Sequence, residues 1–361
     1  MARVINFNPG PSAIPLPVLE KAQSELLDFQ GSGMSIMEHS HRGKVYEAVH
    51  ERTKALLKEL LAIPDSHEVL FMQGGASAQF ALLPMNFLGE GQNADYVNTG
   101  AWSKKALAEA NIVATGREAA SSADKKFSYI PPRDSWSIDD GARYLHITSN
   151  NTIFGTQFAE TPDAGGKPLV ADMSSDIASR PLPIDKYALI YAGAQKNLGP
   201  SGVTIVIANR DFLAEGRTDI PSIFRYSTIL EGNSLQNTIP TFGVYLVGEV
   251  LSWLKAEGGV AAMEKRNTAK TNALYEAIDG SSGFYSCPVE RSSRSRMNVV
   301  FRLPSEELEG KFVSEATAAG MIGTKGHRSV GGIRISTYNA VTPKDIDTLV
   351  SFMADFAKKN G

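Results

Sequence analysis

The chain has 361 residues, of which 42% are hydrophobic and 21% charged, and its formal net charge is −3. This composition is ordinary for a globular protein, and the charge argues against a nucleic acid or an anionic membrane as partner. The single cysteine, Cys287, excludes an internal disulfide framework and a cysteine-rich zinc site. No signal-peptide core and no membrane-length apolar stretch occurs, so we expect a cytoplasmic protein.

Two amphipathic helices are predicted near the N-terminus. Pro17 suits a helix start, after which apolar residues recur at helical spacing as far as Phe29, and a second apolar stripe runs from Val45 to Ile63. Seven short apolar runs follow as candidate buried strands, near residues 68–73, 95–98, 111–115, 143–148, 168–172, 187–192 and 203–208. Helical or turn segments separate several of these runs, which indicates a parallel sheet covered on both faces.

From about residue 240 the pattern changes to two long helices that meet at Gly258-Gly259. A strand at 297–303, a helix at 305–320, a strand at 332–337 and a helix at 343–359 follow. The sequence therefore predicts an α/β protein with a large domain at 16–256 and a small α+β domain at 257–361, joined by the N-terminal segment 1–15.

A lysine and an aspartate at the ends of two successive predicted strands point to pyridoxal phosphate. Lys196 follows the run 187–192, and Asp172 ends the run 168–172. A lysine amine forms a Schiff base with the cofactor aldehyde, and a carboxylate keeps the pyridine nitrogen protonated. Trp102 and Thr152 also follow predicted strands, and ligands collect at the carboxyl ends of strands in open α/β sheets.

Anion-binding features lie at three further places. Gly74-Gly75-Ala76-Ser77 joins a predicted strand to a helix, where free amides and the helix dipole attract a phosphate. The pairs His41-Arg42 and His327-Arg328, with Arg334 nearby, suit a carboxylate or a phosphate. We expect no metal there, because no carboxylate or cysteine shares the spacing of these histidines.

Taken together, these motifs resemble the phosphoserine aminotransferases, a branch of the class V aminotransferases within the fold-type I pyridoxal phosphate enzymes. The resemblance covers nearly the full chain, and the run from Gly326 to Gly332 is its most specific block. It implies a large domain with a mostly parallel seven-stranded sheet between helices, a smaller α+β domain, and a homodimer with shared active sites.

The resemblance also implies the roles of individual residues. Lys196 would carry the cofactor and move the substrate proton, Asp172 would pair with the pyridine nitrogen, and Trp102 would stack on the ring. The implied cofactor contacts are Ala76, Ser77, Trp102, Thr152, Asp172, Ser174, Gln195 and Lys196, with Asn237 and Thr238 from the second subunit. The implied substrate contacts are Arg334 for the α-carboxylate, and His327, Arg328 and the second subunit's His41 and Arg42 for the distal anion.

The implied reaction is transamination between L-glutamate and 3-phosphohydroxypyruvate, which gives O-phospho-L-serine and 2-oxoglutarate in serine biosynthesis. Use of the phosphorylated four-carbon keto acid of vitamin B6 synthesis stays open. The alternatives are an alanine-glyoxylate type aminotransferase, a cysteine desulfurase and a non-catalytic cofactor-binding scaffold. A desulfurase requires a cysteine on a mobile loop, whereas Cys287 falls in a predicted turn and strand. Departures from the family pattern are Pro9, Ala76-Ser77 and Ile239.

Overall fold

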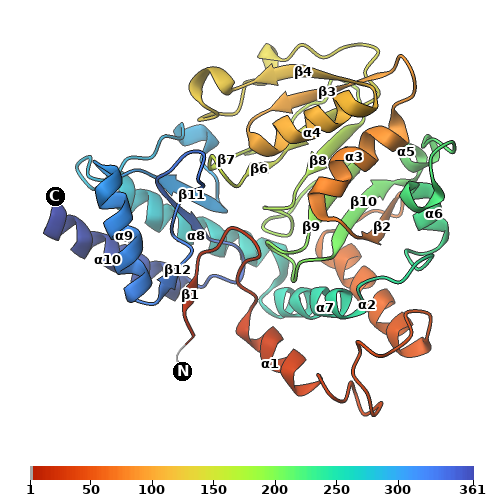
Figure 1. Ribbon diagram of the computed structural model, residues 1–361, viewed down its shortest axis with the longest axis horizontal. Helices are drawn as coiled ribbons and strands as arrows, with labels where there is room; N and C mark the ends of the chain where they lie inside the picture. Colours follow the sequence, from red (N-terminus) through yellow and green to blue (C-terminus); the bar gives the residue numbers. More distant parts are fainter. Residues whose placement is uncertain (1–2) are drawn as a thin grey trace.

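The computed structural model describes residues 3–361, in which a seven-stranded sheet lies between helices and a smaller group of helices and strands lies beside it (Figure 1). β10 is antiparallel to both of its neighbours, and all other strand pairs in the sheet are parallel. The predicted fold class, with its mostly parallel seven-stranded sheet, is therefore confirmed. In spatial order the strands are β2 (His67–Met72), β10 (Thr204–Asn209), β9 (Leu189–Gly193), β8 (Leu169–Asp172), β5 (Leu145–Thr148), β3 (Asn93–Asn98) and β4 (Thr115–Ser121).

Alternate residues of the strands enter two separate hydrophobic clusters, one on each face of the sheet. In β2, Val69 and Phe71 belong to one cluster, whereas Leu70 and Met72 belong to the other. Burial on both faces explains why the strands appear in the sequence as continuous apolar runs. The first face is covered by α1 (Leu16–Ser24), α2 (Lys44–Leu60) and α7 (Thr241–Ala256), and the second by α3 (Gly75–Phe87), α4 (Ala101–Val113), α5 (Arg210–Ala214) and α6 (Tyr226–Glu231).

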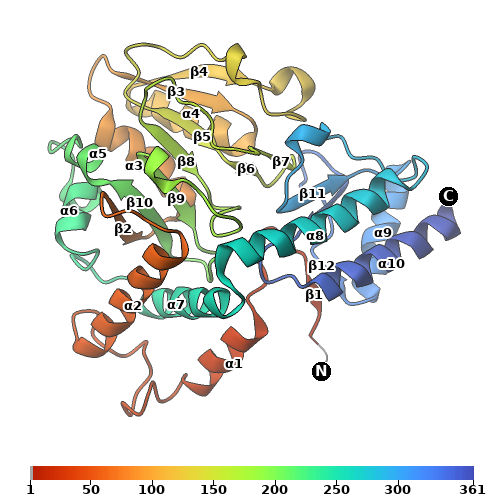
Figure 2. The same cartoon turned by 180° about the vertical axis from the view of Figure 1, so that it is seen from behind.

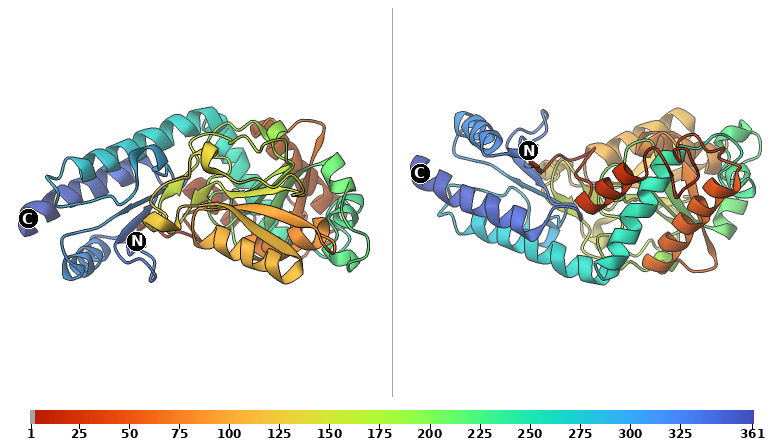
Figure 3. Two further views of the ribbon diagram at one scale, coloured as in Figure 1. Left: turned by 90° about the horizontal axis from the view of Figure 1, so that it is seen from above. Right: turned by 90° about the horizontal axis from the view of Figure 1, so that it is seen from below.

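A third hydrophobic cluster lies in the C-terminal part of the chain. The helix α8 contributes Met263 to the first cluster and Leu274 to the third, and Figure 2 shows it running from the sheet into the smaller unit. Seen from above, this unit extends to one side of the sheet (Figure 3). The remaining elements are β1 (Ile5–Asn6), which pairs with β12 (Met321–Ile322), the pair β11 (Asn298–Phe301) and β13 (Ile333–Ser336), the pair β6 (Asn150–Asn151) and β7 (Thr156–Gln157), and α8 (Gly259–Asp279), α9 (Glu306–Ala318) and α10 (Pro343–Asn360). The domain boundary at 256/257 stays a prediction, which the separate third cluster supports.

Two sequence-based expectations about single elements were wrong. The expected strand at 111–115 is the end of α4, and the strand begins at Thr115. The apolar Ile112 that suggested a strand lies at the exposed end of that helix, whereas the real strand, β4, lies at the sheet edge and has no apolar run. The first helix ends at Ser24, so Phe29 packs into the core from the loop beyond it. Among the helices within residues 3–361, none is both long and apolar enough to cross a membrane.

Candidate active site

Lys196 lies in the turn that follows β9, at the carboxyl end of the parallel strands. Its Nζ atom donates a hydrogen bond to Thr152 Oγ1 at 2.7 Å and lies 5.6 Å from the centre of the Trp102 ring. Burial lowers the pKa of Lys196 to about 8; Asp172 opposes this shift and the cation of Arg334 adds to it. At mildly alkaline pH the amine is thus largely neutral, which is the form that attacks an aldehyde or accepts a proton.

Asp172 ends the neighbouring strand β8 and is only 5% exposed. Its Oδ1 atom accepts a hydrogen bond from the amide of Ser174 at 2.9 Å, and the Ser174 hydroxyl accepts one from the amide of Gly193 at 3.1 Å. Burial raises the pKa of Asp172, while the nearby Lys196 and the Ser174 hydrogen bonds lower it. The structure therefore places a buried carboxylate within the electrostatic reach of the amine, held by the backbone of both strands.

The turn between β2 and α3 has the geometry of an anion cradle. Gly74 and Gly75 have φ angles of +91° and +64°, in the left-handed region that favours glycine. A Cβ atom on Gly74 would come within 2.4 Å of the Ala78 side chain, so the turn requires glycine there. Ala76 and Ser77 form the first turn of α3, where amides lack helical acceptors and the helix dipole is positive.

Arg334 is a buried guanidinium without a counter-ion. It lies in β13 and is 6% exposed, and within residues 3–361 no carboxylate lies within salt-bridge distance. One terminal nitrogen donates a long 3.5 Å hydrogen bond to the carbonyl of Thr152, and Nε has no partner. Burying an unpaired cation is costly, so this arrangement is typical of a site that receives an anion.

His327 and Arg328 lie in the exposed loop that precedes β13. His327 Nδ1 accepts a hydrogen bond from the Ser329 amide at 3.2 Å and lies 2.7 Å from the Ser329 hydroxyl. Its pKa is lowered by partial burial, and further by Arg334, Arg328 and Lys105. The free imidazole is accordingly mostly uncharged at neutral pH, in a region of positive potential.

The other predicted anion ligands gather in a separate group. Arg42 donates hydrogen bonds to the carbonyls of Leu235 and Gln236 at 3.2–3.4 Å, immediately before the exposed Asn237 and Thr238. Among the described residues, no hydrogen bond links His41, Arg42, Asn237 or Thr238 to Lys196, Asp172 or Arg334. Within residues 3–361 of one chain, Arg42 therefore contacts the segment that leads into Asn237 and Thr238, and none of the four residues is hydrogen-bonded to the lysine side chain.

The family model for class-V aminotransferases matches residues 4–349 of this chain. The chain belongs to the class V aminotransferase family. A phosphoserine aminotransferase from Lysinibacillus sphaericus is 55% identical over 358 residues, which cover 99% of each chain. The solved structure of a phosphoserine aminotransferase from Bacillus circulans subsp. alkalophilus has a TM-score of 0.98 at 52% identity and covers 99% of each chain. A pyridoxal phosphate-bound phosphoserine aminotransferase from Trichomonas vaginalis has a TM-score of 0.93 at 37% identity, covering 98% of this chain and 100% of that one.

The residues of this class V chain fit a phosphorylated pyridine aldehyde. The lysine amine, the buried carboxylate and the open helix N-terminus match the aldehyde, the ring nitrogen and the phosphate of such a ligand. Trp102 offers a half-buried ring face beside Lys196, and its Nε1 atom is buried without a hydrogen-bond partner. Gln195 lies next to the lysine, and its Oε1 atom lies beside Gly193, 2.5 Å from where a Cβ atom on that residue would be.

Some residues that support the site were not identified from the sequence. Asp176, four residues after Asp172, is buried, and its carboxylate accepts hydrogen bonds from Ser149 Oγ and, at 3.1 Å, from Gln157 Nε2. The only indication of this residue in the sequence was the presence of a second aspartate four residues after Asp172. Asn197 Oδ1 accepts a hydrogen bond at 2.9 Å from the amide of Asn339, which ties the lysine turn to the segment beyond β13. A hydrogen bond between segments so far apart in the chain produces no local sequence pattern from which it could be predicted.

Two departures from the family pattern have a place in the fold. The carbonyl of Pro9 accepts a hydrogen bond from the Tyr338 hydroxyl at 2.8 Å, a contact that does not depend on the side chain at this position. Ile239 is 4% exposed and packs in the first hydrophobic cluster.

Cys287 is half-buried against the third cluster, and burial raises the pKa of its thiol. A protonated thiol packed against a core is a poor nucleophile, which argues against a desulfurase.

Proposed function

We propose that this chain is a phosphoserine aminotransferase that uses pyridoxal 5'-phosphate to move an amino group between L-glutamate and 3-phosphohydroxypyruvate. The observation that carries the proposal is the buried Arg334 without a counter-ion, next to Thr152, to which the Lys196 amine donates a hydrogen bond. Both amino-group acceptors, 3-phosphohydroxypyruvate and 2-oxoglutarate, are α-keto acids with an α-carboxylate and a distal anion. The full-length similarity to phosphoserine aminotransferases supports this substrate pair.

The proposed division of work follows from where the side chains lie. Arg334 binds the α-carboxylate and so fixes the substrate Cα near Lys196. Neutral Lys196 removes the proton from Cα, and the hydroxyl of Thr152 orients the amine. The bound cofactor supplies the electron-withdrawing ring that makes this proton acidic. Asp172 would accept a hydrogen bond from the ring nitrogen of the bound cofactor and would keep that nitrogen protonated.

We assign the phosphate and distal-anion contacts in the same way. The amides of Ala76 and Ser77, the side chain of Gln195 and the partner subunit's Asn237 and Thr238 would hold the cofactor phosphate. His327 and Arg328 would bind the distal anion. Ser174 would lie at the edge of the cofactor ring. Its hydroxyl already accepts a hydrogen bond from the amide of Gly193.

A homodimer completes this proposal. In this homodimer, the active site of one copy would receive four residues of the other copy: His41, Arg42, Asn237 and Thr238. Within residues 3–361, none of these residues is hydrogen-bonded to the lysine of its own chain. The exposed side chains of Ile223 and Phe224 lie along an apolar pocket that also includes Asn237, which suits a subunit contact. We further propose a cytoplasmic location, and use of the phosphorylated four-carbon keto acid of vitamin B6 synthesis as a second acceptor.

The test is a half-reaction assay with the purified holoenzyme. Glutamate is expected to change the absorption of the bound cofactor, and 3-phosphohydroxypyruvate to restore it, with one O-phosphoserine formed per cycle. The four-carbon acceptor is tested in the same way. Lys196→Ala should abolish both changes and the borohydride-reducible bond to the cofactor. A cofactor spectrum that glutamate leaves unaltered would favour the non-catalytic scaffold, and restoration by glyoxylate but not by the phosphorylated acid would favour the alanine-glyoxylate type.

A further inference from the structure

Lys270 is a buried lysine that no step of the proposed reaction uses. It lies on α8, the helix that runs from the sheet into the smaller unit (Figure 2), and is 2% exposed. Within residues 3–361 its Nζ atom makes no salt bridge. Burial lowers the pKa of Lys270 to about 7; Arg266 on the same helix lowers it further, and Asp345 near the start of α10 opposes the shift. Because the charged form is costly here, packing alone does not explain a lysine at this position.

The ammonium of Lys270 donates hydrogen bonds to three backbone carbonyls of one short segment, residues 337–341. The acceptors are the carbonyls of Thr337 at 2.8 Å, Tyr338 at 3.0 Å and Val341 at 2.8 Å. A protonated lysine has three N–H groups, so the three carbonyls use all of them. The 337–341 segment lies between β13 and α10 and belongs to neither element, so its conformation depends on contacts of this kind.

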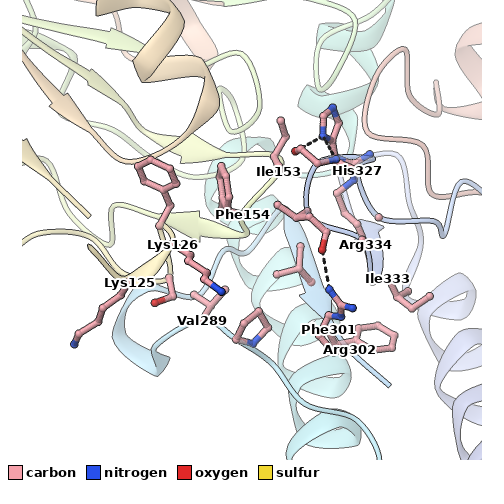
Figure 4. A pocket seen from close by; sticks show the side chains of 18 residues that line it. Lys125, Lys126, Ile153, Phe154, Val289, Phe301, Arg302, His327, Ile333 and Arg334 are labelled. Atoms are coloured by element: carbon pink, nitrogen blue, oxygen red, sulfur yellow. Dashed lines mark hydrogen bonds between the residues drawn. The ribbon is translucent and has the colours of Figure 1, made fainter. Parts of the chain in front are cut away.

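The 337–341 segment connects the two halves of the candidate active site. β13, which ends one residue before it, contains Arg334, and this side chain lines the pocket shown in Figure 4. At the other side, the amide of Asn339 donates a hydrogen bond at 2.9 Å to Oδ1 of Asn197, which directly follows Lys196. The segment therefore extends from the strand of the buried guanidinium to the turn of the lysine.

Two asparagines add to these contacts. Asn267, which precedes Lys270 by one turn of α8, donates a hydrogen bond to Oδ1 of Asn339 at 2.9 Å, and Nδ2 of Asn339 donates to the carbonyl of Ala178 at 2.9 Å. These bonds do not involve Lys270. If its three hydrogen bonds were lost, the segment would thus stay attached through Asn339, and only its position on α8 would change.

We propose that Lys270 is a positioning residue for the proposed reaction. Its three hydrogen bonds fix the 337–341 segment on α8, and the segment fixes Arg334 relative to the turn of Lys196. The distance between these two side chains matters because Arg334 binds the α-carboxylate while Lys196 removes the proton from the adjacent Cα. The inference rests on the proposed function, and it gives Lys270 no contact with substrate or cofactor.

The experiment is a stopped-flow measurement of the glutamate half-reaction with wild-type and Lys270→Met holoenzyme. Methionine is similar in length to lysine and has no donor. The rate at saturating glutamate should fall roughly ten- to a hundredfold, because a small misplacement of reacting groups is sufficient for such a loss. The glutamate concentration for half-saturation should change less than about threefold, since pairing with β11 keeps the strand of Arg334 in place. Cofactor affinity should also be unchanged.

Leu274→Ala is the matched control. Leu274 lies one turn beyond Lys270 on α8 and is buried in the third cluster, so its truncation leaves a cavity and lowers stability without removing a hydrogen bond to the segment. Its rate at saturating glutamate should stay within about twofold of wild type. If Lys270→Met does not fold, Lys270→Gln replaces it; the shorter side chain can still donate two hydrogen bonds, so the expected loss of rate is roughly three- to tenfold.

The inference would be overturned by a rate within about twofold of wild type in the folded Lys270 variant, or by a loss of glutamate affinity without a loss of rate. An equal loss of rate in Leu274→Ala would overturn it as well, because lowered stability would then be the cause. In each of these results the wild-type protein reacts with glutamate, so the proposed function stands. A wild-type holoenzyme that does not react would overturn the proposed function, and this inference with it.

Discussion

Replacement of Arg334 by leucine should remove activity without loss of stability. The guanidinium can offer the α-carboxylate two charge-assisted hydrogen bonds of about 1.5–3 kcal/mol each, hence about 3–6 kcal/mol in the transition state. That corresponds to a loss of roughly 10²- to 10⁴-fold in kcat/KM, equal for glutamate and for the phosphorylated keto acid, because both carry this group. The free protein, however, loses only a buried cation that has no counter-ion, so its stability should stay the same or rise.

Arg302 provides the opposite control within the same small unit. Its Nε donates to Glu309 at 2.6 Å, and the Glu309 side chain is 8% exposed. Arg302→Leu leaves this carboxylate without its cation and should lower the unfolding free energy by about 1–3 kcal/mol, with kcat/KM close to wild type. Steady-state kinetics with both substrates measure kcat/KM of the Arg334→Leu and Arg302→Leu variants, and urea unfolding measures the unfolding free energy of each variant. A loss below tenfold for Arg334→Leu, or activity that falls in proportion to stability in both variants, would refute the assignment of Arg334.

Four further outcomes are expected. Asp172→Asn should keep the fold but lose roughly a hundredfold or more in single-turnover rate, since an amide cannot hold the ring nitrogen protonated; a near-normal rate contradicts this. Arg328→Leu should weaken the phosphorylated keto acid about ten- to a hundredfold relative to glutamate, since a phosphate uses more donors than a carboxylate; equal losses for both substrates count against a phosphate-favouring site. The rate at which apoenzyme takes up cofactor, measured by stopped-flow absorbance, should rise with pH and then level off, with the midpoint of the rise near pH 8, where Lys196 becomes neutral. A rate that continues to rise toward pH 10 would contradict this. Mixed and exchanged Arg42→Ala and Lys196→Ala proteins should recover some activity, because one hybrid site contains neither change; no recovery despite proven exchange argues for sites built from one chain.

The sequence was sufficient to place residues at the ends of buried strands. Asp172 and Lys196 were found because a continuous apolar run marks a buried strand, and the residue that follows it must lie at the sheet edge where ligands bind. The turn at Gly74-Gly75 was placed between a strand and a helix from the sequence, and the φ angle of +91° at Gly74 explains why glycine occurs there.

The sequence could not predict the direction of a strand or the position of the edge strand β4. The run in β10 is buried on both faces, so its composition is the same whether it lies parallel or antiparallel to its neighbours. β4 lies at the sheet edge and needs little apolar character, whereas Ile112 suggested a strand that does not exist. The tie between Asn197 and Asn339 joins segments that are far apart in the chain, and a single sequence contains no trace of such a pair.

The buried cation of Arg334 also favours the neutral form of the Lys196 amine. Burial is the largest cause of the lowered pKa of Lys196, and the positive charge of Arg334 lowers it further, against the opposing effect of Asp172. Arg334 therefore has an effect before any substrate arrives, because it destabilises the charged form of the amine. Loss of this cation in Arg334→Leu should raise the pKa of Lys196, so the midpoint for cofactor uptake by apoenzyme should move above pH 8. It should remain below the ordinary value of about 10.4, because leucine leaves the burial of the amine in place. Arg302→Leu, which removes a cation already paired with Glu309, should leave the midpoint where it is. If both variants show the wild-type midpoint, Arg334 acts only on the substrate and the electrostatic link between the two residues is absent.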